Sequence, residues 1–140
     1  MAPPRVSIRD TRDPLRKTRI NQLAEELMPE CYKDAEKLAR NPITFKIAGQ
    51  LYYAAGSIGA NVAEGYSRAS GRDRARYFEY SLGSTRETMS WYRSSVPVLG
   101  DGVVEERLDC LEEIRRMLSA IIPREREKTL QKRSGRTPGI

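Results

Sequence analysis

The sequence contains no histidine, and this absence excludes one class of metal-dependent helical proteins. Di-metal sites in helical bundles use Glu-x-x-His motifs, which this chain cannot form. It also lacks a nucleophile paired with a base and a glycine-rich loop that could cradle phosphates. Glu64 and Glu87 could together act in acid–base catalysis or hold a divalent metal. The histidine that accompanies glutamate in the metal sites of helical bundles is missing, however. We therefore expect no enzyme activity, no catalytic residue, no metal and no cofactor.

Long apolar runs are also missing, and cysteine is scarce. No run approaches the roughly 20 apolar residues that a membrane-spanning helix needs. The basic residues 1–19 are not followed by an apolar stretch, which argues against a secretory signal. Cys31 and Cys110 stand alone on apolar helical faces, as reduced core residues do. These features predict a cytoplasmic protein that does not associate with membranes.

Positive charge is present in excess, and it is distributed unevenly. The 140 residues have a net charge of +6, of which residues 1–19 carry +4 and residues 124–140 carry +4, while the body between them carries −2. Within that body, residues 66–76 hold four arginines against one aspartate. Basic segments attract phosphate polymers by releasing counterions, although many serve only solubility. The candidates for nucleic-acid binding are Arg68, Arg72, Arg74, Arg76, Lys132, Arg133 and Arg136.

These basic residues also have a simpler interpretation. The arginines of residues 66–76 could form a solvated helix start with salt bridges to Asp73 or Glu79, and the C-terminal group could be a disordered solubilising tail. Both interpretations remain open at this point.

Apolar residues recur at helical spacing in four segments that are separated by proline, glycine and turn residues. The segments are residues 20–38, 43–67, 72–96 and 104–121. Pro29 should kink or divide the first helix, and the last helix should end near Pro123. We expect a flexible basic arm over residues 1–13, a bundle over residues 14–123, and a mobile basic tail over residues 124–140. Short loops and the lack of strand-like alternation predict an all-α, antiparallel up-and-down four-helix bundle.

The second and third predicted helices carry an unusual polar face beside their apolar stripes. It contains Gln50, Tyr53, Ser57, Asn61 and Glu64 on one helix, and Tyr77, Tyr80, Ser84, Glu87 and Trp91 on the other. Glycine inside a helix costs about 1 kcal/mol relative to alanine, so Gly59 and Gly83 indicate close helix packing.

Two interpretations of this face remain open. The polar residues could be buried hydrogen-bonding groups that fix helix register within one subunit, with Arg86 and Arg93 available to pair with the carboxylates. Alternatively, they could form a contact between subunits or with a partner, to which the aromatic residues Tyr53, Tyr77, Tyr80 and Trp91 would contribute.

The polar face also carries two motifs that resemble those of a known family. The first stands here as Gln50, Ser57, Ile58, Asn61, Val62, Ala63, Glu64, Gly65, Tyr66 and Arg68, and the second as Gly83, Ser84 and Glu87. These motifs resemble those of the four-helix-bundle family named for the 23S rRNA intervening-sequence proteins. The accessory variability protein of diversity-generating retroelements resembles a relative of the same family. The resemblance covers about residues 18–122. Gly59 replaces the usual proline, Ser67 replaces a glycine, and Thr85 and Thr88 replace leucines, which implies a thinner seam on the third helix.

The resemblance implies a homo-oligomeric ring, a pentamer, with a basic surface or channel. For the retroelement relative it implies binding to nucleic acid and to a reverse transcriptase. The leading hypothesis is therefore a non-enzymatic, oligomeric accessory protein that binds RNA or DNA mainly through phosphate contacts. The alternative is a scaffolding oligomer that binds a protein partner without nucleic acid. A small helical regulatory module is a third interpretation, suggested only by size and basic tails.

Overall fold

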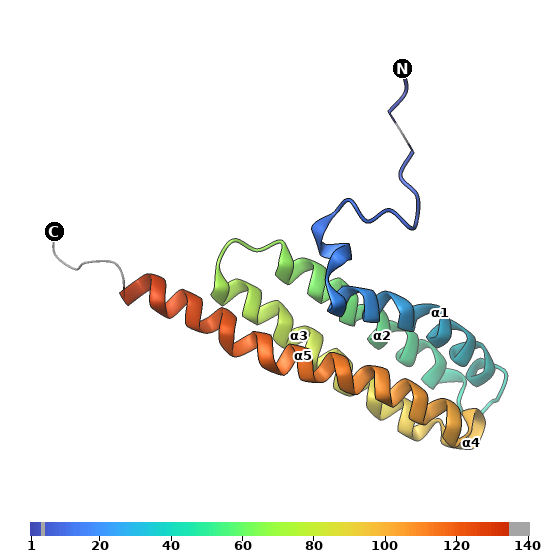
Figure 1. Ribbon diagram of the computed structural model, residues 1–140. Helices are drawn as coiled ribbons and strands as arrows, with labels where there is room; N and C mark the ends of the chain where they lie inside the picture. The colour runs from blue at the N-terminus through green and yellow to red at the C-terminus, as the bar shows by residue number, and fades with distance from the viewer. Residues whose placement is uncertain (4, 135–140) are drawn as a thin grey trace.

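Four long helices lie side by side in the computed structural model and form an elongated bundle (Figure 1). The structure describes residues 1–3 and 5–134, and side chains as far as residue 129. A short 3-10 helix, η1 (Pro14–Lys17), precedes α1 (Arg19–Ala39), α2 (Phe45–Tyr66), α3 (Gly71–Ser94), the single turn α4 (Val96–Leu99) and α5 (Asp101–Ser134). No strand occurs in the part of the chain that the structure describes. The all-helical class predicted from the sequence is confirmed.

The helix starts follow from local sequence. Thr18 caps α1 by accepting a hydrogen bond from the backbone N–H of Asn21, and Ser70 caps α3 in the same way through Asp73. Gly100 adopts a positive φ of 83° between α4 and α5, a conformation that residues with a side chain rarely adopt. Ser70 and Gly100 thus lie at the breaks that the sequence predicts before the third and the last helix.

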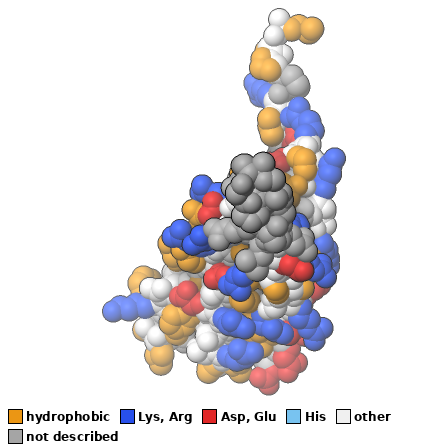
Figure 2. All heavy atoms as spheres, turned by 90° about the vertical axis from the view of Figure 1, so that its left-hand side faces the viewer, with side chains coloured by type: hydrophobic (Ala, Val, Ile, Leu, Met, Phe, Trp, Pro, Cys, Tyr) orange, Lys and Arg blue, Asp and Glu red, His pale blue; other side chains and the backbone are white. Residues whose placement is uncertain are grey.

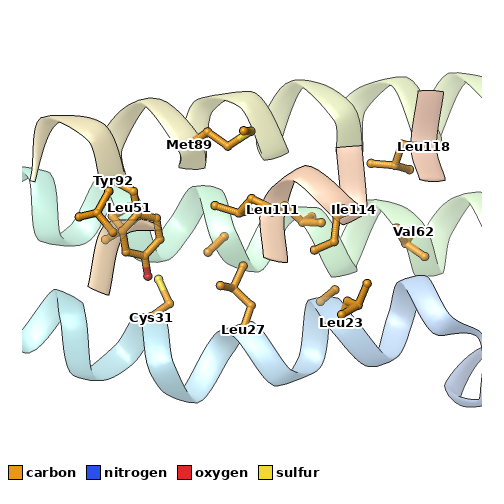
Figure 3. Packing of buried hydrophobic residues seen from close by; sticks show 14 of the residues in the cluster. Leu23, Leu27, Cys31, Leu51, Val62, Met89, Tyr92, Leu111, Ile114 and Leu118 are labelled. Atoms are coloured by element: carbon orange, nitrogen blue, oxygen red, sulfur yellow. The ribbon is translucent and has the colours of Figure 1, made fainter. Parts of the chain in front are cut away.

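The core lies between the long helices and is made by their apolar stripes. Helix α2 packs against both α1 and α3, while α5 packs against α3 and, less extensively, against α1. Figure 3 shows side chains from all four helices, among them Cys31, Leu51, Tyr92 and Leu111, directed into one interior. Thr85 and Thr88 are fully buried on α3, and their hydroxyls donate to the carbonyls of Ser81 and Ser84. The hydroxyl groups of these two threonines, which stand where the family has leucines, thus find their hydrogen-bond acceptors within their own helix.

The predicted helix boundaries at two prolines are wrong. Pro29 does not divide the first helix, because α1 runs without a break from Arg19 to Ala39. Leu27 and Cys31 are buried on either side of it, and this packing outweighs the loss of one backbone hydrogen bond. Pro123 does not end the last helix, since α5 continues to Ser134. The segment beyond Pro123 packs against the start of α3 through contacts described below.

The N-terminal arm is tied to the bundle near its end. The guanidinium of Arg16 donates to the carbonyls of Ile8 and Asp10 at 2.8 and 2.6 Å, and to Glu25 on α1 at 2.7 Å. These contacts direct residues 8–10 toward the first turns of α1. Of the helices described, none is both long and apolar enough to cross a membrane.

Candidate functional site

The end of the bundle where α3 begins carries a groove lined by arginines. Arg72 and Arg76 of α3 and Arg126 of α5 line an open hollow of about 840 Å³, together with Asp73 and Glu79. Arg126 and Glu79 form an ion pair, whereas Arg72 has no ion pair among the described residues. Figure 2 views this end of the molecule, where Lys and Arg side chains are interspersed with acidic and apolar ones. The structure therefore brings two of the predicted binding arginines to one groove.

Arg74, a third candidate, is directed into a network that joins α3 to α5. Its guanidinium donates to Glu125 at 2.8 Å and to the carbonyls of Arg68 and Ala69 at 3.0 and 3.1 Å. Lys128 donates to the other oxygen of Glu125 at 3.0 Å. Burial alone would raise the pKa of Glu125, but the hydrogen bonds from Arg74 and Lys128 outweigh it and lower the pKa. Arg74 is thus engaged in holding two helices together.

Arg68 and Arg76 each contact a tyrosine. The guanidinium of Arg68 lies 4.6 Å from the ring centroid of Tyr77, donates to its hydroxyl at 3.0 Å and pairs with Glu64 at 2.9 Å. Arg76 donates to the hydroxyl of Tyr80 at 2.8 Å. The two tyrosine rings meet edge to face with centroids 5.7 Å apart. Cation–π contacts and hydrogen bonds thus hold both guanidiniums at the surface.

The remaining basic candidates lie at the far end of α5. Lys132 and Arg133 belong to its last turn, and the positions of their side chains are outside the described residues. Arg136 lies entirely outside the described residues.

The polar residues of the motifs and Gly83 lie on the outside of the α2–α3 hairpin, whereas Ile58, Val62 and Gly65 of the first motif are buried. Ser57 donates to the carbonyl of Tyr53 and Asn61 donates to the carbonyl of Ser57, both at 2.9 Å within the same helix. The half-buried Trp91 donates to Glu87 at 3.4 Å, also within one helix. Exposed or half-buried positions are occupied by Gln50, Ser57, Asn61, Glu64, Gly83, Ser84 and Glu87.

The interpretation of these residues as a buried network within one subunit is therefore wrong. Their hydrogen bonds are local, and neither Arg86 nor Arg93 pairs with Glu64 or Glu87. Gly83 does not touch another helix of the chain either, because a Cβ built on it would meet nothing within 4 Å. Gly59 does face a neighbour, since its Cβ would lie 3.5 Å from that of Ala24. The interpretation as a contact surface stays a prediction.

The buried polar network of this protein lies elsewhere, between α1, α3 and α5. Asp34 is 2% exposed and accepts hydrogen bonds from Tyr92 at 2.7 Å and from Arg107 at 2.8 Å. Burial, reinforced by the neighbouring Cys31 and Asp34, raises the pKa of the Tyr92 hydroxyl. Burial also raises the pKa of the Cys31 thiol to about 11, which makes it unreactive near neutral pH.

Sequence reasoning missed this network, although a signal was present. Asp34 falls at helical spacing between Cys31 and Leu38, and Arg107 falls between Val104 and Leu111. A single acidic and a single basic residue, each inside an otherwise apolar stripe, indicate a buried pair. The pair is structural, since both charges are satisfied within the chain.

Two glycines allow the helices to approach at the α3 end of the bundle. A Cβ on Gly71 would lie 2.1 Å from the carbonyl oxygen of Glu125, and one on Gly65 would lie 2.6 Å from the ring of Phe78. Both distances are far shorter than van der Waals contact, so only glycine fits at these positions without movement. Gly71 therefore permits the segment of α5 beyond Pro123 to lie against α3.

No group of three or more acidic or cysteine side chains that could hold a metal ion is found in the described ranges. The groups that could act at the surface are instead guanidiniums and tyrosine rings, which bind anions and stack on planar groups. A second groove between α3 and α5, lined by Arg86, Arg93 and Arg115, adds to them.

Comparisons with known proteins agree with the motifs. No curated protein matches the chain. A protein of unknown function from the S23 ribosomal protein family of Bacteroides thetaiotaomicron VPI-5482 has a similar solved structure, with a TM-score of 0.67. The two chains are 21% identical, and the match covers 74% of this chain and 97% of that one, which shows a shared fold. The model of the 23S rRNA-intervening sequence protein family matches residues 16–120. The chain therefore belongs to the 23S rRNA-intervening sequence protein family.

Proposed function

We propose that this protein is a non-enzymatic, oligomeric accessory protein that binds nucleic acid through its phosphate backbone. The observation that carries the proposal is the groove in which Arg72, Arg76 and Arg126 converge. Glu79 is paired with Arg126, so Asp73 is the one remaining acidic side chain among the described residues that line the groove, against the two guanidiniums of Arg72 and Arg76. Guanidiniums bind phosphate oxygens with charge-assisted hydrogen bonds that do not depend on base sequence.

The assembly we infer is a homo-oligomeric ring, a pentamer, of antiparallel up-and-down four-helix bundles. Its support is the outward position of the polar residues of the family motifs together with the aromatic residues beside them. Tyr53 is 77% exposed, and Tyr80 and Ser57 lie on the outer side of the same hairpin. Aromatic residues with few neighbouring lysines are typical of protein interfaces. A ring would also repeat each basic groove and strengthen the local positive potential.

The protein partner that the family resemblance suggests is a reverse transcriptase, in the cytoplasm, where the two free cysteines stay reduced. An alternative function is scaffolding of a protein partner without nucleic acid. It is favoured by exposed apolar residues near the α1–α2 turn, where Ile43 is 88% and Phe45 is 64% exposed. Exposed apolar groups of this kind mark protein contacts more often than nucleic-acid contacts.

The test compares nucleic-acid binding by the wild type and by the variant Arg72→Ala/Arg76→Ala. Fluorescence anisotropy with a labelled strand, as RNA and as DNA, at about 50 mM salt should give measurable affinity that the variant loses. The same samples in size-exclusion chromatography with light scattering report the oligomeric state. Absence of binding to either strand at low salt by a protein of native circular dichroism would reject nucleic-acid binding and leave the scaffolding function.

A further inference from the structure

One face of α3 carries a row of arginines along the whole helix. Arginine occupies four of its seven positions, and the others are one glutamate, one glycine and one serine. The row is Arg72, Arg76, Glu79, Gly83, Arg86, Ser90 and Arg93. The steps alternate between four and three residues, so these positions lie on one side of the helix. At 1.5 Å per residue, the row extends about 31 Å.

Both ends of this row face α5 across a groove. The first is the groove of Arg72 and Arg76 already described. The second, of about 340 Å³, is lined by Arg86, Ser90 and Arg93 of α3 and by Glu112 and Arg115 of α5. The two grooves thus lie along a single seam between the same two helices.

The second groove holds guanidiniums that the protein itself does not use. Arg115 binds the only acidic side chain that lines it, Glu112, with two hydrogen bonds of 2.6 and 2.8 Å, and Arg116 adds a third at 3.3 Å. The hydrogen bonds from Arg115 lower the pKa of Glu112 to about 2, so it stays ionised and paired at neutral pH. Arg86 and Arg93 have neither an ion pair nor a side-chain hydrogen bond in the described part of the chain. The groove therefore has positive charge in excess of what Glu112 neutralises.

The stretch of seam between the grooves carries no acidic side chain that lacks a partner. Glu79 is paired with Arg126, and Gly83 presents only backbone, with open space where a Cβ would stand. On α5, helical spacing between Arg115 and Arg126 places the exposed, neutral Ser119 on this side. A negatively charged chain following the seam thus meets no unpaired carboxylate between the two grooves.

From these observations we propose that the α3–α5 seam is a continuous track for the sugar–phosphate backbone of one nucleic-acid strand. One part of the strand lies at Arg72 and Arg76 and another at Arg86 and Arg93. The row contains no aromatic residue, so the contacts are to phosphates and the track does not distinguish bases. This inference rests on the proposed function, because it assigns a path to the nucleic acid on the same protein.

The deciding variant is Arg86→Ala/Arg93→Ala, assayed with a labelled single strand of about 20 nucleotides, which is long enough to span both grooves. At about 50 mM salt it should bind at least tenfold more weakly than the wild type, and the slope of log affinity against log salt should become shallower by about 1.4, since each single-strand phosphate contact contributes about 0.7. Arg86→Lys/Arg93→Lys keeps both charges and should recover most of the affinity.

The matched control is Lys37→Ala/Lys46→Ala, which removes two charges from exposed positions on α1 and α2, the helices that do not form the seam. It should retain wild-type affinity within about threefold, because long-range charge effects are screened in salt. If the wild type binds but Arg86→Ala/Arg93→Ala behaves like this control, the track is rejected while the proposed function stands. If the wild type does not bind at all, both are rejected.

Discussion

Arg74 of α3 donates a hydrogen bond of 2.8 Å to Glu125 of α5, and this ion pair joins the first turn of one helix to the part of the other that lies beyond Pro123. Glu125 is only 8% exposed in its side chain, and Lys128 binds its second oxygen. Because the pair is largely removed from water, its loss would leave a buried charge without a partner. The contact explains both why α5 continues past a proline and why one of the predicted binding arginines is held inside the chain.

Replacing Glu125 by alanine should destabilise the protein by about 2 kcal/mol, because Arg74 and Lys128 both lose their carboxylate partner. The free energy of unfolding in urea measures the effect. Glu64→Ala is the control, since its pair with Arg68 is exposed and should change the stability by less than about 1 kcal/mol. Equal effects of the two substitutions would show that the Glu125 pair is not buried in solution.

The same pair predicts how stability depends on pH. The pKa of Glu125 is lowered in the folded state from an ordinary value of 4.5. A lowered folded-state pKa contributes stability above the unfolded-state value, and the contribution is lost as pH falls through the folded-state value. The difference in unfolding free energy between wild type and Glu125→Gln should therefore shrink between about pH 6 and about pH 3. A difference that stays constant over that range would contradict the lowered pKa.

Two glycine substitutions in α3 should act in opposite directions. Gly71→Ala should destabilise by more than about 1 kcal/mol, because its Cβ would collide with the carbonyl oxygen of Glu125. Gly83→Ala should stabilise the single chain by up to about 1 kcal/mol, because its Cβ meets nothing and alanine is the better helix former. Thermal unfolding with light scattering on both variants separates folding from assembly. Loss of the oligomer in Gly83→Ala would place that residue at a subunit contact.

Tyr92→Phe tests the buried network. The substitution removes the hydrogen bond of 2.7 Å to Asp34 and leaves the carboxylate with Arg107. We expect a loss of about 1 to 3 kcal/mol in the free energy of unfolding, as for other hydrogen bonds to charged groups. Tyr80→Phe is the comparison, because its hydroxyl bonds to Arg76 at the surface and should contribute less than about 1 kcal/mol. An unchanged free energy of unfolding in Tyr92→Phe would mean that Asp34 does not need the hydrogen bond from the hydroxyl of Tyr92.

The sequence predicts those properties that depend on a single helix, namely its position in the chain and its buried face. The apolar stripe that includes Leu51 and Ile58, for example, predicts both the helix and its buried side, because the spacing of apolar residues indicates which side of a helix faces the core. Properties that depend on two distant segments were not accessible. The extension of α5 depends on contacts of Glu125 with Arg74 and Gly71, and charge counting could not tell that Arg74 is paired while Arg86 is not.

The position of the motif residues shows the same limit. Their polar and small side chains are unusual for a bundle helix, and the sequence alone allows either a buried network or an outer surface. The side chains of Ser57 and Asn61 form hydrogen bonds within their own helix, on its outer side. Which side of a helix faces outward depends on how that helix packs against the rest of the bundle. The pair that does fix the core, Asp34 and Arg107, is 73 residues apart in the chain.

The salt dependence of nucleic-acid affinity tests the central claim most directly. For wild-type protein and a single strand, the account predicts that log affinity falls linearly with log salt, with a slope of about −3 if four arginines of the α3 row each contact a phosphate. Affinity that does not change between about 50 and about 200 mM salt, or no affinity at low salt, would contradict it.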